Sequence, residues 1–291
     1  MSGPDQIFDR KLLRWRKARA APTLAAHAFL LDRVAADLAD RLTLIRRQFA
    51  VGADLGAHGL RLSAALLATG KVERMWRAAA TPELAGPPDG AAFVCDQEAL
   101  PFAPQSLDLL VCALNLQFAN DLPGVLVQIR RALKPDGLFL ASLLGGRTLE
   151  ELRNCFAAAE IETTGGLSPR VAPFADVRDA GQLLQRAGFA LPVADAELLQ
   201  VSYPSPSALM RDLKAMGAGN VLVERRKQPL RRDTLAAVAA LYQRDYSVNG
   251  RITASFEIIT LTGWAPHASQ QQPLRPGSAQ TSLAKAVGKP D

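Results

Sequence analysis

The segment from residue 95 to residue 146 constrains the fold of this chain more than any other part of the sequence. A near-continuous apolar run, Leu107 to Leu114, contains one charged residue, Asp108. Such a run predicts a strand that is covered on both faces of a sheet. Apolar residues then recur at helical spacing over 122–133, and a Lys-Pro-Asp-Gly turn precedes a second apolar run, 138–144. The order strand, helix, strand predicts a βαβ unit with parallel strands.

The same alternation of strands and helices continues on both sides of this unit. Further strands are predicted at 49–55, 72–79, 91–95, 193–203 and 254–263. Helices are predicted at 22–47, 60–68, 148–163, 176–187, 205–216 and 233–246. Seven strands that alternate with helices predict an α/β fold, a doubly wound Rossmann-like sheet. We expect a basic helical arm at 1–47, one domain at 48–268 and a flexible tail at 269–291 that is rich in Gln, Pro, Gly and Ser.

The formal net charge of +6 is concentrated in two stretches of the chain. The cations of the arm are Arg10, Lys11, Arg14, Arg16, Lys17 and Arg19, and those of the second cluster are Arg225, Arg226, Lys227, Arg231 and Arg232. Such a surface attracts an acidic protein or brings the chain close to an anionic membrane surface, although a solvated helix face has the same composition. Because no aromatic residue is interleaved with the second cluster, no nucleic-acid partner is predicted.

Cysteine usage and hydropathy bear on the compartment. Cys95, Cys112 and Cys155 form no Cys-x-x-Cys pair, and two of them lie in apolar runs, so we expect buried free thiols. No apolar stretch approaches the roughly 18 residues of a membrane span, and no signal peptide is visible. These features together predict a cytoplasmic protein.

Three motifs within the central segment carry a family resemblance. Asp-x-Glu-x-Leu-Pro-Phe at 96–102, Leu-Asp-Leu-Leu at 107–110 and Leu-Lys-Pro-Asp-Gly at 133–137 together resemble class I S-adenosylmethionine-dependent methyltransferases. The resemblance implies S-adenosylmethionine as the cofactor and a seventh strand that runs antiparallel to its neighbours. It also implies that the insertion before that strand, 204–250, covers the substrate.

The resemblance places the cofactor at the turns that follow the first, second and third strands. Asp54 and Gly56 match the Asp-x-Gly-x-Gly-x-Gly turn of the family, whereas His58 and Leu60 replace its other glycines. His58 is either a functional substitution or the result of relaxed selection for close approach of a cofactor. The cofactor-binding residues that the resemblance implies are Asp54, Gly56, His58, Gly59, Asp96, Gln97, Glu98 and Asn115.

The acidic residue that grips the cofactor ribose in this family is missing from the second strand. Ala79 stands near the expected position, and neither Glu73 nor Glu83 fits it. A hydrogen bond to a charged group contributes about 1.5–3 kcal/mol, so losing two weakens binding on the order of 100-fold. Asp96 does match the family's adenine-contacting acid after the third strand.

Segments outside the predicted cofactor-binding region indicate one particular family within this superfamily. They resemble the mitochondrial NADH dehydrogenase (complex I) assembly factor 5 family and its bacterial relatives at 7–10, 144–153, 165–169, 173–174, 186–189, 212–217, 263–264 and 277–279. That family is associated with arginine hydroxylation on a complex I subunit, which implies an enzyme acting on a protein substrate. A malonyl-carrier methyltransferase of biotin synthesis is a more distant relative.

No catalytic residue can be assigned from the sequence. Iron-dependent oxygen chemistry usually needs two histidines and a carboxylate on one face, whereas His27, His58 and His267 are isolated, so no metal site is predicted. Two function classes therefore stay open. Asp54, Gly56 and Asp96 favour a cofactor-binding enzyme, while the departures at the glycine turn and the ribose acid favour a catalytically inactive assembly scaffold.

Overall fold

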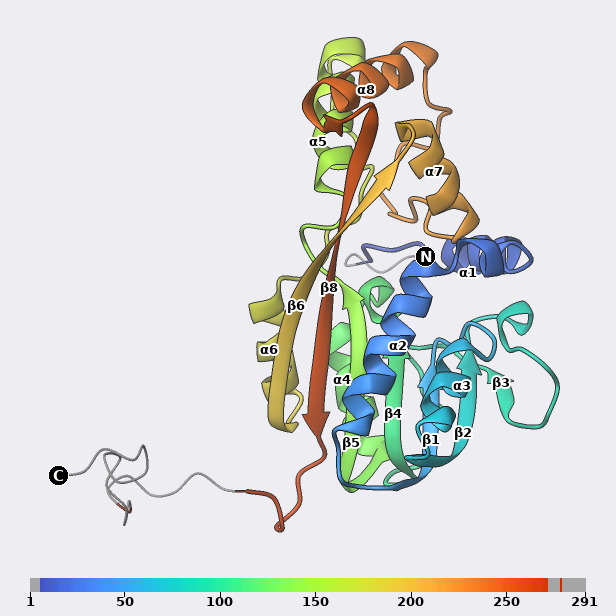
Figure 1. Cartoon of the computed structure of the whole chain (residues 1–291), viewed down its shortest axis with the longest axis vertical. Coiled ribbons are helices and arrows are strands. Elements are labelled where there is room, and N and C mark those ends of the chain that lie inside the picture. The colour runs from blue at the N-terminus through green and yellow to red at the C-terminus, as the bar shows by residue number, and fades with distance from the viewer. Residues whose placement is uncertain (1–5, 272–277, 279–291) are drawn as a thin grey trace.

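The computed structural model describes residues 6–271 and Ser278, and its centre is an eight-stranded sheet with helices on both faces (Figure 1). The strands are β1 (Phe49–Leu55), β2 (Val72–Ala79), β3 (Ala92–Val94), β4 (Leu107–Ala113), β5 (Leu133–Leu144), β6 (Ala190–Tyr203), β7 (Ser247–Val248) and β8 (Arg251–Trp264). The helices are α1 (Arg10–Ala20), α2 (Phe29–Thr43), α3 (Arg61–Ala68), α4 (Leu122–Ala132), α5 (Glu150–Thr164), α6 (Val177–Arg186), α7 (Pro206–Ala215) and α8 (Arg232–Asp245), with short 3-10 helices η1 (Leu24–His27), η2 (Pro82–Leu84) and η3 (Leu116–Phe118). Most of the predicted tail, 269–291, lies outside the described residues.

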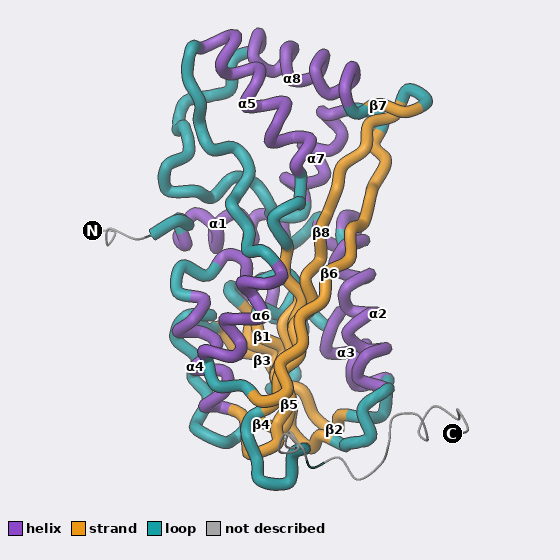
Figure 2. The backbone as a smooth tube through the Cα atoms, turned by 90° about the vertical axis from the view of Figure 1, so that its left-hand side faces the viewer, coloured by secondary structure: helices purple, strands orange, loops and turns teal. Residues whose placement is uncertain are grey.

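The sheet has the order β3-β2-β1-β4-β5-β8-β6, and β7 forms a short hairpin with β8. Strands β1 to β5 are parallel, whereas β8 runs antiparallel to both β5 and β6. Helices α2 and α3 cover one face of the sheet, and α4 and α6 cover the other (Figure 2). The predicted doubly wound α/β fold is therefore confirmed, with the hairpin strand β7 as an addition to the seven predicted strands.

The βαβ unit shows why these residues form these elements. Every residue of β4 is buried, and its charged residue, Asp108, accepts hydrogen bonds from the Nζ of Lys134 at 3.0 Å and the backbone N–H of Val51 at 3.0 Å. The carboxylate of Asp121 caps α4 by accepting from the N–H of Gly124 at 2.8 Å. The predicted Lys-Pro-Asp-Gly turn instead lies within β5, where a register shift against β4 and a positive φ of 62° at Asp136 absorb the bend.

The long strands β6 and β8 extend beyond the rest of the sheet and carry a second group of helices. Helices α5 and α8 pack against each other at the far end, and α7 lies nearer to α1 (Figure 1). The segment 204–250 therefore divides into two parts. Its first half, α7 and the loop after it, faces the carboxyl ends of β4 and β5, whereas α8 lies beyond them.

The predicted arm also divides into two parts. Helix α2 packs against α3, β4 and β5, so it belongs to the core on that face of the sheet. Helix α1 instead contacts η2 and lies across the carboxyl ends of the central strands. No described helix has the length and apolar character needed to cross a membrane. Cys112 and Cys155 are buried free thiols, while the free thiol of Cys95 is half-buried.

Candidate cofactor cleft and its neighbouring cavities

A tight turn follows β1 and packs against the residue that follows β4. Gly56 has a φ of +81°, and a Cβ at this position would lie 2.2 Å from Nδ2 of Asn115, so both the backbone conformation and the close approach require glycine. Asn115 in turn donates from Nδ2 to Oε1 of Gln97. The sequence-predicted residues Gly56 and Asn115 are thus in direct contact across the carboxyl ends of β1 and β4.

Four of the predicted residues line one small pocket, which we call the cofactor pocket. Its lining includes Gly56, Asp96, Gln97 and Asn115, and its volume is about 20 Å³. The other four predicted residues lie around it rather than in its lining. Asp54 is buried beneath the turn, Gly59 donates its N–H to the carbonyl of Leu84, Glu98 accepts from the N–H of Asn120, and His58 faces a separate cavity.

Helix α1 forms one wall of the cofactor pocket through Arg10, Leu13, Arg14 and Lys17. The guanidinium of Arg10 forms ion pairs with Asp96 and, at 2.5 Å, with Glu98. The ammonium of Lys17 donates to Oδ1 of Asn115, and burial lowers the pKa of Lys17 to about 8. Arg10 and Lys17 therefore contact the candidate site, contrary to the expectation that the arm cations form one exposed surface.

Buried polar atoms without a hydrogen-bond partner collect around this cleft. Among the described residues they are Arg10 Nε, Asp54 Oδ2, Thr81 Oγ1, Gln97 Nε2, Gln117 Oε1 and Arg130 Nε. Arg10 lies on α1, and Asp54 is the second-to-last residue of β1. Thr81, Gln97 and Gln117 follow the carboxyl ends of the parallel strands β2, β3 and β4. Arg130 lies elsewhere, on α4. Each such buried atom costs about 1–3 kcal/mol when it stays unpaired. Their concentration at one edge of the sheet is typical of a site that holds a polar ligand.

Asp54 is a buried carboxyl with a raised pKa beneath the turn after β1. Its side chain is 1% exposed, and burial raises the pKa of its carboxyl to about 7, against the opposing effect of Arg77. Arg77 cannot neutralise it fully because its guanidinium donates to Asp89 at 2.6 Å. A buried carboxyl whose pKa is about 7, and whose Oδ2 has no hydrogen-bond partner among the described residues, is typical of a functional site.

The residue that lines the cofactor pocket just beyond β2 is Ala80, one position after the Ala79 that the sequence indicated for the ribose acid. Strand β2 ends at Ala79 as predicted, but this side chain packs in an apolar cluster with Ala57 and Leu84. Ala78 and Ala80 line the cofactor pocket instead. Because successive side chains of a strand point to opposite faces, the position that faces the pocket beyond the strand end is Ala80 rather than Ala79.

A second cavity of about 80 Å³, which we call the middle cavity, lies next to the cofactor pocket and shares Lys17 with it. His58 and His27 both line it. Burial, with the nearby Lys17 and Arg61, lowers the pKa of His58 to about 3, so its imidazole is neutral at physiological pH. His58 therefore supplies neutral ring nitrogens to this cavity rather than a cation.

His27 is held in place by two residues that are distant in the sequence. Its Nδ1 lies 2.5 Å from Oδ1 of Asp212, and Oη of Tyr203 donates to the other carboxylate oxygen of Asp212 at 2.7 Å. Sequence reasoning treated His27 as isolated, because Asp212 stands 185 positions away. The arrangement orients the imidazole through Nδ1, as in catalytic histidine–carboxylate pairs.

A third cavity of about 280 Å³ lies under α7 and the loop after it, and we call it the apolar cavity. It shares Leu30, Phe118, Leu144, Met216 and Ala218 with the middle cavity, so the two adjoin each other. Its lining is mostly aliphatic and aromatic, contains no Asp or Glu, and includes two cationic side chains, Arg170 and Lys214.

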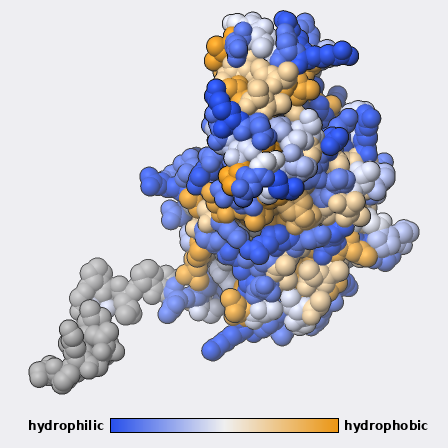
Figure 3. All heavy atoms as spheres, turned by 45° about the horizontal axis from the view of Figure 1, so that its top comes forward, coloured by the Kyte–Doolittle hydropathy of each residue, from blue (hydrophilic) through white to orange (hydrophobic). Residues whose placement is uncertain are grey.

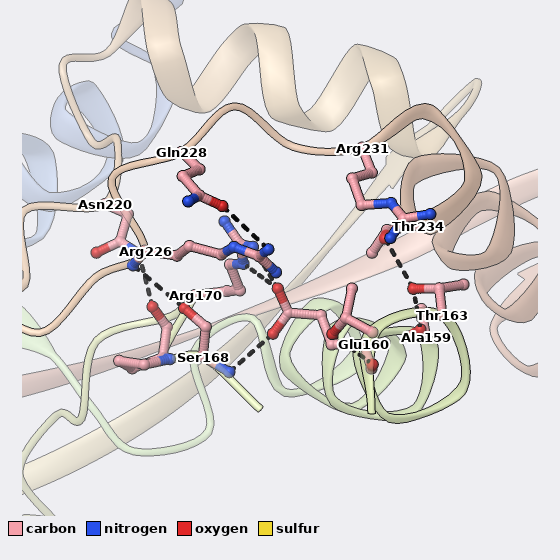
Figure 4. A network of polar contacts seen from close by, with 12 residues as sticks. Ala159, Glu160, Thr163, Ser168, Arg170, Asn220, Arg226, Gln228, Arg231 and Thr234 are labelled. Carbon is pink, nitrogen blue, oxygen red and sulfur yellow. Dashed lines mark hydrogen bonds and ion pairs between the residues drawn. The ribbon is translucent and has the colours of Figure 1, made fainter. Parts of the chain in front are cut away.

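A polar network fixes the wall of the apolar cavity (Figure 4). The carboxylate of Glu160 is 1% exposed, and it accepts from Nε of Arg170 and the N–H of Ser168, both at 2.8 Å. Asn220, from the loop after α7, donates to the carbonyl of Pro169 at 2.7 Å. These contacts join the loop after α5 to the loop after α7, so the cavity wall is preformed.

Among the described residues, no group of three or more His, Cys, Asp or Glu side chains is placed to hold a metal ion. The cofactor pocket, the middle cavity and the apolar cavity form a series of adjoining cavities, and His27 and His58 line the middle one.

Comparisons with known proteins agree with this arrangement. Residues 53–141 match the family described as "Methyltransferase domain". The chain is 37% identical to "Arginine-hydroxylase NDUFAF5, mitochondrial" of Danio rerio, over 97% of this chain and 91% of that protein. It is 35% identical to "Malonyl-[acyl-carrier protein] O-methyltransferase" of Laribacter hongkongensis, over 92% and 94% respectively. In fold it is similar to the YcgJ protein from Bacillus subtilis, with a TM-score of 0.54 and 15% identity over 79% of this chain and 98% of that one.

One sequence-based prediction is corrected by these comparisons. The cytoplasmic location was predicted from the free cysteines and from the lack of a signal peptide. The NDUFAF5 relatives are named as mitochondrial proteins, and this contradicts the prediction. Free thiols and the lack of a long apolar helix do not distinguish one reducing compartment from another.

Proposed function

Since this chain belongs to the class I S-adenosylmethionine-dependent methyltransferase superfamily and is related to NDUFAF5, we propose that it binds S-adenosylmethionine in the cofactor pocket and acts on a protein side chain held in the apolar cavity. The observation that carries the proposal is the group of unpaired buried polar atoms around the cleft, including Arg10 Nε and Gln97 Nε2, whose residues line the cofactor pocket. A polar ligand seated there supplies the missing partners.

The polar groups of the cleft match those of the cofactor, but the space between them is too small to hold it. Asp96, Gln97 and Asn115 offer acceptors and donors around a turn that brings backbone close to the pocket. The remaining volume of about 20 Å³ is too small for a nucleoside, so α1 has to move before the cofactor enters. S-adenosylmethionine supplies an electrophilic methyl group when it is bound.

Residues between the two ends of the series have roles in this proposal. The middle cavity lies between the apolar cavity and the cofactor pocket. Through it, an acceptor side chain can reach from the apolar cavity toward the turn after β1. His27, oriented by Asp212, accepts a proton from the acceptor through its other ring nitrogen, Nε2. The resemblance to the complex I assembly family extends the proposal to a complex I subunit as the protein acted on, with arginine as the modified residue.

A second acceptor class is favoured by the lining of the apolar cavity. Lys214 lines this cavity without an ion pair among the described residues, whereas Arg170 is paired with Glu160, and no acidic residue lines the cavity, so it suits a carboxylate better than a guanidinium. Methyl transfer to a carboxyl group, the reaction named for the Laribacter hongkongensis relative, is therefore the alternative. Mass spectrometry of the modified acceptor distinguishes the two proposals, because fragmentation places the added group either on an arginine side chain or on a carboxyl group.

The Arg10→Ala variant tests whether α1 bars the cofactor. We expect it to bind S-adenosylmethionine about tenfold more tightly than wild type, because it removes a charge-assisted contact that holds α1 closed. Association should also be faster, since opening of the helix precedes entry. Calorimetry measures the affinity and stopped-flow fluorescence measures the rate.

Lys11→Ala is the matched control, because Lys11 is exposed on the same helix and lines none of the cavities described above. It should leave both quantities unchanged. Weaker binding by Arg10→Ala would show that Arg10 contacts the cofactor instead of excluding it. If neither wild type nor Arg10→Ala binds at millimolar S-adenosylmethionine, the enzyme proposal fails and an assembly scaffold is left.

A further inference from the structure

A basic pocket lies between α1 and α7, outside the series of cavities that the proposed function uses. Its volume is about 600 Å³, and it is lined by Trp15, Arg16, Arg19, Ala20, Thr23, Arg211, Lys214, Ala215, Gly217 and Gly219. Four of these side chains are cationic and none is acidic. Like charges gathered around one hollow repel one another, so the arrangement favours an anionic occupant.

The cations of this pocket keep their charge available. Among the described residues, no carboxylate forms an ion pair with Arg19, Arg211 or Lys214. Arg16 donates to the carbonyl of Asn220 at 2.6 Å, which fixes its side chain without neutralising it. Burial, and then the nearby Arg225, lower the pKa of Arg16.

The second cluster predicted from the sequence differs in this respect. Arg225 pairs with Asp9 at 3.2 Å, and Arg231 pairs with Asp233 at 2.5 Å. Part of the 225–232 cluster is therefore neutralised within the chain. The face drawn in Figure 3 is mainly hydrophilic, with smaller apolar patches between the polar areas. Of the arm cations, Arg16 and Arg19 line the basic pocket beside α7.

An aromatic side chain adds a flat apolar contact to the basic pocket. Trp15 is 56% exposed, and the guanidinium of Arg19 lies 5.3 Å from the centroid of its ring. This cation–π contact holds Arg19 beside the indole. A polypeptide segment carrying both carboxylates and aliphatic atoms matches such a surface, whereas a free inorganic anion makes no use of the ring.

The basic pocket also adjoins the proposed acceptor site. Lys214 and Gly219 line both the basic pocket and the apolar cavity. A segment bound in the basic pocket therefore lies next to a side chain that enters the cavity. We propose that the basic pocket docks an acidic segment of the protein substrate, next to the residue that is modified; its place beside the acceptor depends on the proposed function.

Fluorescence anisotropy of labelled peptides tests this proposal on the full-length chain. The probe is a short peptide with consecutive glutamates, and its comparison is the same peptide with glutamines. We expect the acidic peptide to bind at least tenfold more tightly, and its affinity to fall as salt rises. Arg19→Glu and Arg211→Glu should each weaken binding about tenfold or more, because each replaces an attractive charge with a repulsive one.

Arg46→Glu is the matched control, since Arg46 is exposed on the loop between α2 and β1, away from α1 and α7. It makes the same change of net charge and should leave the affinity unchanged. A thermal unfolding curve and an S-adenosylmethionine titration on each variant separate loss of docking from loss of fold or cofactor binding. If the acidic peptide binds as expected but S-adenosylmethionine does not bind, the docking inference is supported and the proposed function is contradicted.

Three outcomes would overturn the inference. The first is equal binding of the glutamate and glutamine peptides. The second is an equal loss for Arg46→Glu and the two pocket variants, which would mean that only net charge matters. The third is displacement of the acidic peptide by inorganic phosphate at a similar concentration, or stronger binding to anionic vesicles or single-stranded RNA, since each would identify another class of occupant.

Discussion

Replacing Asp54 with asparagine should raise the free energy of unfolding by about 1–3 kcal/mol at a pH of about 8.5. Removing the buried charge contributes about 4 kcal/mol, which is offset by about 1–3 kcal/mol for the unpaired amide. Burial raises the pKa of this carboxyl from 3.8 to about 7, and each pKa unit corresponds to about 1.36 kcal/mol. Asparagine keeps the shape of the side chain and removes the charge. Urea unfolding followed by circular dichroism measures the difference.

The effect depends on pH in a direction that follows from the raised pKa. The native state holds the Asp54 proton more tightly than the unfolded state, so ionisation disfavours the fold. The cost is absent below the unfolded value of 3.8, grows as pH rises, and is complete above about pH 7. Wild type should therefore lose stability relative to Asp54→Asn across this window and show no further loss above it.

Asp32→Asn provides the control, because Asp32 is 53% exposed and its ion pair with Arg61 lies on the surface. It should change the free energy of unfolding by less than about 1 kcal/mol. Parallel pH profiles for wild type and Asp54→Asn would contradict the prediction. A residue that lowers the stability of the fold in this way is typically retained for function. We therefore expect Asp54→Asn to bind S-adenosylmethionine more weakly than wild type.

The sequence predicted the scaffold well because each element carries local signals. The buried parallel strand β4 is a continuous apolar run, and α4 begins at a residue whose side chain caps it. The antiparallel direction of β8 came from the family resemblance alone, since apolar runs do not encode strand direction. The bulge at Asp136 was taken for a turn, because Pro, Asp and Gly are also typical turn residues.

The candidate site was less predictable because its important contacts join distant parts of the chain. Arg10 meets Asp96 across 86 positions, and His27 meets Asp212 across 185. Contacts between residues so far apart in the chain cannot be predicted from hydrophobic periodicity or from local motifs. Family motifs placed Asp96 and Gly56 at the cleft, but they say nothing of α1, which covers the same residues. Helix α1 therefore looked like an exposed arm in the sequence.

Restoring an acid at residue 80 should tighten binding of S-adenosylmethionine about 100-fold. Ala80 lines the cofactor pocket just beyond the end of β2, where an aspartate can accept from both hydroxyls of a ribose. Two such hydrogen bonds to a charged group account for an effect of this order. Calorimetric titration of Ala80→Asp measures it, and Ala80→Asn should give a smaller gain because its amide is uncharged.

Ala79→Asp separates this explanation from a general effect of added negative charge. Ala79 is fully buried against Ala57 and Leu84, so an aspartate there has no partner and lowers the stability of the fold. It should give no gain in affinity, because successive residues of a strand face opposite sides. If residue 79 rather than residue 80 improves binding, the register assigned to the end of β2 is wrong. If neither does, the cofactor ribose does not lie beside β2, and the cleft binds its ligand in an orientation unlike that of the methyltransferase family.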